Sequence, residues 1–156
     1  LVKAGKGQKQ KVRSAHNVYD EKTHSGTSTI ETEVTVIDPK QFIDEGLVYF
    51  MPCPKSPHGC DTDPTGSYII GSGKLAAVIP VFSFDKMQKA IADKSFEGMY
   101  DGLPVLKYDA VLHGEVQKPG LGPLHTEFDG KGFAYTSFFV SSEIVKWDIE
   151  KLQVVD

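Results

Sequence analysis

Short apolar runs separated by turns dominate the chain after residue 32. Residues 33–37 alternate polar with β-branched side chains and end at an Asp-Pro pair, which predicts a strand. The apolar run at 47–52 predicts a buried strand. Pro80 lies within another strand-like run, and because proline cannot donate to a β-ladder we expect an edge or a bulge there. The same reasoning predicts further strands at 67–70, 77–84, 103–108, 110–116, 133–140 and 143–147.

Two segments depart from this pattern. Residues 6–31 are polar, rich in Gly, Ser and Thr and without periodicity, so they predict a long surface loop. Met87, Ala90 and Ile91 form one apolar stripe at helical spacing, and Asp85 can cap the helix that carries them. Strands joined by Asp/Gly turns, with one short inserted helix, predict an all-β fold.

Two stretches of the chain share one order of features. In each, a turn that contains proline presents a histidine, His58 or His125, and an Asp/Gly turn and two strand-like runs follow. The histidines are 67 residues apart, and the turn glycines Gly66 and Gly132 are 66 residues apart. Self-similarity at this spacing indicates a repeated β-unit, and we expect about two consecutive blades of a β-propeller over residues 32–156, after a loop-rich lead-in over 1–31.

Charge and composition narrow the classes of function. The chain of 156 residues carries 17 basic and 21 acidic side chains, a net charge of −4, which argues against a nucleic-acid surface. No run approaches the roughly 20 apolar residues of a membrane span. The two cysteines, Cys53 and Cys60, do not define a redox compartment. Because the chain begins at Leu1 rather than methionine and stops after an apolar run, we expect a piece of a longer protein.

The paired histidines are the candidate chemistry. On corresponding turns of successive blades, His58 and His125 would both point toward the propeller axis or its mouth, which suits a metal site because imidazole is a common ligand of copper and zinc. The alternative is that both histidines are structural and hydrogen-bond neighbouring blades. His16 and His24 lie in the predicted loop and His113 in a predicted strand, and none of the three is assigned a role.

Other site chemistries find less support. Cys53, His58 and Cys60 offer three ligands for zinc, but their spacing does not match paired-cysteine zinc motifs and no fourth ligand is evident. A hydrolytic site lacks a Gly-x-Ser-x-Gly motif. The aspartates of the turns, Asp61, Asp63 and Asp129, are interpreted as turn formers.

Two long strings resemble a known family. SPHGCDTDPTGSYIIGSGKL at 56–75 and GLGPLHTEFDGKGFAYTSFFVSSEIVKW at 120–147 resemble the N-terminal domain of nitrous oxide reductase. The segment at 81–109 resembles the branch of that family exported through the general secretory pathway. The resemblance covers most of residues 32–151.

The resemblance implies a fold, a reaction and a location. The family has a seven-bladed propeller with a sulfide-bridged four-copper cluster, CuZ, held by histidines, and a C-terminal cupredoxin domain with a dinuclear copper site, CuA, which is absent from this chain. The enzyme reduces nitrous oxide to dinitrogen and water, the last step of denitrification, in the periplasm. A homodimer and a c-type cytochrome or similar electron donor are also implied.

By position, His58 and His125 match two of the cluster ligands of the family. Family members often have an asparagine two residues before the first of these histidines, where it helps bind calcium, but this chain has Ser56. We expect this piece alone to be inactive, because two ligands cannot hold four coppers. The alternative from another class is a β-propeller interaction module with structural histidines, which would not need a histidine on most blades.

Overall fold

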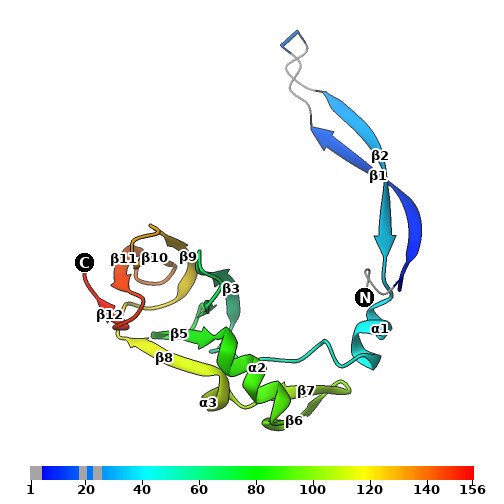
Figure 1. The fold of residues 1–156 in the computed structure, drawn as a ribbon. Coiled ribbons are helices and arrows are strands. Elements are labelled where there is room, and N and C mark those ends of the chain that lie inside the picture. The colour runs from blue at the N-terminus through cyan, green and yellow to red at the C-terminus, as the bar shows by residue number, and fades with distance from the viewer. Residues whose placement is uncertain (1–4, 18–20, 23–25) are drawn as a thin grey trace. The chain divides into compact units, whose positions relative to one another are not determined.

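The computed structural model describes residues 5–17, 21–22 and 26–156, and they divide into two compact units, Leu1–Val48 and Tyr49–Asp156 (Figure 1). The first unit contains a long antiparallel hairpin of β1 (Gln8–Asn17) and β2 (Thr27–Val36), followed by a short helix, α1 (Pro39–Asp44). Asp38 caps that helix by accepting a hydrogen bond of 2.8 Å from the backbone N–H of Lys40.

The hairpin corrects the prediction of a surface loop over residues 6–31. Its strands pair in register over their full length, with Gln8 opposite Val36 and Asn17 opposite Thr27. Cross-strand ion pairs such as Lys9 to Glu33, 2.7 Å apart, and β-branched residues support the ladder. Most of the described side chains of both strands are exposed, and only residues 33–36, at the end of β2, belong to the alternating run from which a strand was predicted.

The second unit contains two four-stranded antiparallel sheets (Figure 1). The first has the order β3 (Pro57–Thr62), β4 (Tyr68–Gly73), β5 (Val78–Ser83) and β8 (Leu112–Gln117). The second has the order β12 (Gln153–Val154), β11 (Glu143–Asp148), β10 (Phe133–Phe138) and β9 (Pro123–Phe128). Each sheet is a meander that begins on an edge strand, and the prediction of a mainly β chain built from two such units is confirmed.

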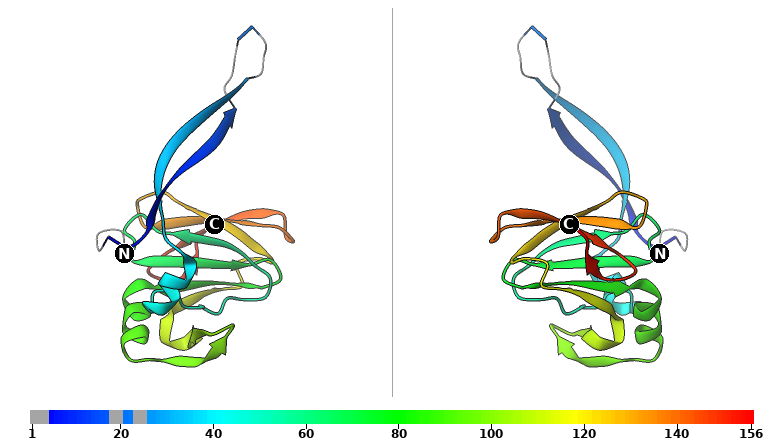
Figure 2. Two further views of the ribbon diagram at one scale, coloured as in Figure 1. Left: turned by 90° about the vertical axis from the view of Figure 1, so that its right-hand side faces the viewer. Right: turned by 90° about the vertical axis from the view of Figure 1, so that its left-hand side faces the viewer.

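An insertion separates β5 from β8. It comprises α2 (Phe84–Ala92), the hairpin of β6 (Phe96–Tyr100) and β7 (Leu103–Leu106), and α3 (Tyr108–Val111) (Figure 2). The expected helix is therefore present, but Ser83 rather than Asp85 is its N-cap, since the Ser83 hydroxyl accepts from the backbone N–H of Lys86 at 3.4 Å. The prediction of one helix is wrong, because α1 and α3 are helical too.

Two strand predictions also need correction. The apolar run at 47–52 forms no strand and contributes only a single bridge, from Phe50 to Val105. Pro80 lies in β5, which is a central strand flanked by β4 and β8, so the expected edge is wrong. The expected bulge has a counterpart one residue on, where the register of β5 with β8 shifts between Val81 and Phe82. The ladder to β4 ends at Val81, so Pro80 is paired only with Glu115 of β8 and no hydrogen bond to β4 is lost there.

The hydrophobic core lies between the two sheets. Trp147 of β11 is fully buried and donates from Nε1 to the hydroxyl of Thr136, 2.9 Å away, which in turn lies 2.8 Å from the hydroxyl of Thr126. This buried polar chain ties β9, β10 and β11 together. A second cluster of buried hydrophobic residues lies where the insertion packs against the first sheet. In this cluster Phe82 of β5 packs with residues of α2, β7 and α3. The members of the main core are Ile70, Ile79, Val81, Val116, Ala134, Phe138, Val145, Trp147 and Ile149.

Candidate metal site

The structure brings His58 and His125 together. His58 is the second residue of β3 and His125 the third residue of β9, and these are the edge strands with which the two sheets begin. Their ring centroids are 4.9 Å apart and their planes are inclined by 73°. The histidines therefore lie on strands rather than in the predicted turns. The prolines that suggested turns, Pro57 and Pro123, are the first residues of those strands, a position that proline tolerates.

Gly59 explains why β3 and β9 approach so closely. A Cβ atom at this position would overlap the backbone carbonyl oxygen of Leu124 in β9 and would lie 3.1 Å from Oδ2 of Asp61. Because the obstructing atoms include backbone, no side-chain rotation can relieve the overlap. The contact that places His58 beside His125 therefore requires glycine at position 59.

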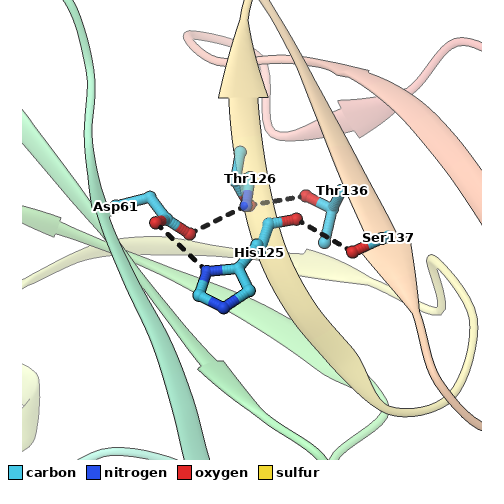
Figure 3. Close-up of polar contacts among 5 residues, drawn as sticks. All are labelled: Asp61, His125, Thr126, Thr136 and Ser137. Atoms are coloured by element: carbon cyan, nitrogen blue, oxygen red, sulfur yellow. Dashed lines mark hydrogen bonds and ion pairs between the residues drawn. The ribbon is translucent and has the colours of Figure 1, made fainter. Parts of the chain in front are cut away.

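Asp61 of β3 links its strand to β9 through two contacts, with His125 and Thr126 (Figure 3). Its Oδ2 accepts a hydrogen bond of 2.8 Å from the backbone N–H of Thr126, and its Oδ1 lies 3.5 Å from Nδ1 of His125. The carboxylate is mostly shielded, with 23% of its side chain exposed, whereas 59% of the His125 side chain is exposed. Interpreting Asp61 as a turn former was wrong, since the residue lies in β3 and bonds to another sheet.

The main chain at His125 is held from the opposite side as well. Ser137 of β10 donates from its hydroxyl to the carbonyl oxygen of His125 at 3.4 Å, and Thr126 is anchored to Thr136 in the core (Figure 3). The imidazole thus projects from a fixed backbone while its ring remains accessible. Neutral imidazoles presented in this way are suitable ligands for copper or zinc.

The other two aspartates are turn formers, as expected. Asp63 accepts from the backbone N–H groups of Thr65 and Tyr68, at 3.1 and 2.8 Å. Burial raises the pKa of the Asp63 carboxyl, but the hydrogen bonds from Thr65, Tyr68 and Ser67 outweigh it, and the pKa is lowered overall. Asp129 occupies the same place in the second sheet, where it accepts from the N–H groups after it.

The zinc alternative gains no support from the geometry. Among the described residues, no three or more His, Cys, Asp or Glu side chains gather closely enough to hold one metal ion, so Cys53, His58 and Cys60 do not form a three-ligand site. Both cysteines are free thiols. Burial raises the pKa of the Cys53 thiol, and the neighbouring Cys60 raises it further.

The remaining histidines lie elsewhere. His113 is on β8, half-buried, with its ring centroid 4.7 Å from that of Tyr68, as expected for a packed imidazole. His16 belongs to β1, and His24 lies outside the described residues. In the part of the chain that the structure describes, no helix has the length and apolar character needed to cross a bilayer.

Comparison with known proteins gives one consistent result. No protein-family model matches the chain. The chain is 39% identical over 108 residues to the nitrous-oxide reductase of Stutzerimonas stutzeri, covering 69% of this chain and 15% of that protein. It is 35% identical over 123 residues to that of Pseudomonas fluorescens, covering 77% and 17%. The chain thus spans about a sixth of the length of these relatives, and it is similar to one part of nitrous-oxide reductases.

Proposed function

We propose that this chain is part of a copper-dependent nitrous-oxide reductase and that His58 and His125 each supply an imidazole ligand to its copper cluster. One observation carries the proposal: two histidines that are distant in sequence meet on the first strands of two successive sheets, with ring centroids 4.9 Å apart. The similarity to nitrous-oxide reductases, which covers most of the second unit, supports the same conclusion.

The residues around the two rings fit this role. Gly59 permits the close contact of the strands, and both imidazoles are exposed, so their ring nitrogens are accessible to a ligand. When bound, the copper cluster supplies two electrons to nitrous oxide, which with two protons gives dinitrogen and water. His58 and His125 would bind copper as neutral imidazoles and would neither give nor take a proton while bound. The other ligands would come from elsewhere in the complete protein.

The wider setting follows from the same proposal. The two meanders would be two blades of a seven-bladed propeller, and a cupredoxin domain outside this chain would hold the CuA site. The complete enzyme would be a periplasmic homodimer, exported through the general secretory pathway and reduced by a c-type cytochrome or a similar donor. Ser56 stands where the calcium contact of the family is expected, so we assign calcium no ligand in this chain.

The test uses the complete protein that carries this segment. His58→Ala and His125→Ala should each lower the copper content and abolish nitrous oxide reduction while leaving the protein folded. His113→Ala is the matched control, because His113 packs on Tyr68 and is not part of the contact between β3 and β9. Wild-type copper content and activity in either of the first two variants would refute the ligand assignment, and the alternative of structural histidines would then stand.

A further inference from the structure

The carboxylate of Asp61 has one fixed partner and one variable partner. Its Oδ2 accepts from the backbone N–H of Thr126 at 2.8 Å, and a backbone N–H can only donate. Its Oδ1 faces Nδ1 of His125 at 3.5 Å, the upper limit of a hydrogen bond, and a ring nitrogen can either donate or accept. The short bond to Thr126 therefore orients the carboxylate, and the orientation decides which atom His125 meets (Figure 3).

The chemistry of a carboxylate determines the tautomer of the ring. An ionised carboxylate only accepts hydrogen bonds, so Nδ1 of His125 must carry the proton to bond with it. A neutral imidazole protonated on Nδ1 has its free lone pair on Nε2, the nitrogen on the far side of the ring from Asp61. A hydrogen bond of this kind to a carboxylate is a common way to fix the direction of a metal-binding histidine.

We propose that Asp61 is a positioning residue that selects Nε2 of His125 as the metal-binding nitrogen and holds the ring beside His58. The part that concerns the metal rests on the function proposed above, whereas the choice of tautomer does not. Asp61 acts across the two sheets, because it belongs to β3 and both of its partners belong to β9. It does not contact the metal itself.

Replacing Asp61 with asparagine keeps the hydrogen bond to Thr126 but changes the group that faces Nδ1 of His125 from an acceptor to a donor. The amide has nearly the same shape, and its oxygen must face the N–H of Thr126, because the amide nitrogen cannot accept that hydrogen bond. The NH₂ group of Asn then faces Nδ1 of His125 and donates to it. Asp61→Asn should therefore retain the link between the sheets but move the ring proton from Nδ1 to Nε2.

Asp129→Asn is the matched control. Asp129 is the turn carboxylate of the second sheet, accepts from Lys131 and Phe133, and contacts neither histidine. Its substitution changes charge by the same amount as Asp61→Asn. A general effect of lost charge or lost stability would therefore appear in both variants, whereas the change of tautomer should appear only in Asp61→Asn.

The experiment is nitrogen-15 NMR of the imidazole rings in the full chain of 156 residues, at a pH where the rings are neutral. His125→Ala identifies the signals by their loss. We expect Nδ1 of His125 to be protonated in the wild type and in Asp129→Asn, and Nε2 to be protonated in Asp61→Asn. The same tautomer in the wild type and Asp61→Asn would overturn the proposal, even if copper content depends on His125. If the tautomer switches but His125→Ala retains copper in the complete protein, the positioning role stands and the ligand role fails.

Discussion

Replacing Gly59 with alanine tests whether the close approach of β3 and β9 creates the histidine pair. The new Cβ would overlap the carbonyl oxygen of Leu124, and an unstrained contact needs more than 3 Å between such atoms. The strands must therefore move apart by on the order of 1 Å, since neither backbone has a flexible end that could turn away. That movement would separate the ring of His58 from that of His125.

The loss of folding free energy in Gly59→Ala can be estimated from the group that the new Cβ would meet, which is backbone rather than a side chain. Overpacking against side chains typically costs about 1–3 kcal/mol, and a backbone obstacle places Gly59→Ala near the upper end, at about 3 kcal/mol. For a unit of about 100 residues, each kcal/mol lowers the melting temperature by roughly 4 °C, so a decrease of about 12 °C is expected. Gly98→Ala is the control, because Gly98 also lies in a strand but has nothing within 4 Å of its Cβ position.

The assay is thermal unfolding followed by tryptophan fluorescence. Trp147 is the single tryptophan of the chain and is buried in the core of the second unit, so its emission reports the unfolding of that unit alone. Gly98→Ala should melt at the wild-type temperature or a few degrees above it, since alanine restricts the unfolded chain more than glycine does. If Gly59→Ala melts within about 2 °C of Gly98→Ala, the steric argument is refuted.

Two further changes probe the scaffold around the site. Trp147→Phe leaves a cavity and removes the hydrogen bond to Thr136, so the free energy of unfolding should fall by about 1–3 kcal/mol, measured by urea denaturation with circular dichroism. An unchanged denaturation midpoint would show that the buried polar chain contributes nothing. Asp63 has a lowered pKa, so its carboxylate stabilises the fold above pH of about 4, and that contribution is lost as the pH falls through the folded pKa. Asp63→Asn should therefore melt below the wild type at pH 7, and the difference should shrink as the pH falls through the folded pKa of Asp63; a difference that stays constant over this range would contradict this.

Two of the strands that the sequence predicted correctly, β10 and β11, have one buried face. In β10 and β11, side chains alternate between the core and the opposite face, as Ala134, Thr136, Val145 and Trp147 show, so the pattern of period two is present in the sequence. The hairpin of β1 and β2 has no such face, and its polar and β-branched residues do not alternate between core and solvent. Apolar runs can mislead in the other direction, because residues 47–52 pack on the second cluster through Tyr49 and Met51 without joining a ladder.

The site was predictable in part, because its two histidines belong to a repeated sequence pattern. The equal spacing of the two histidine segments indicated that His58 and His125 occupy equivalent places in repeated units, and the structure places both on first strands. Asp61 could not be found in this way, because its partners are 64 and 65 residues away and a turn offers a local explanation for an aspartate two residues before an Asp-Pro pair. Nor does a glycine in a Pro-His-Gly string reveal that a carbonyl group of another sheet occupies its side-chain space.

The most direct test of the copper assignment is anomalous X-ray diffraction at the copper absorption edge, from crystals of the complete protein purified with its copper. The proposed function predicts an anomalous peak within bonding distance of both His58 and His125, reached through Nε2 of His125. Copper peaks located elsewhere, with both imidazoles unbonded, would contradict the assignment and leave the histidine pair as a structural contact between two sheets.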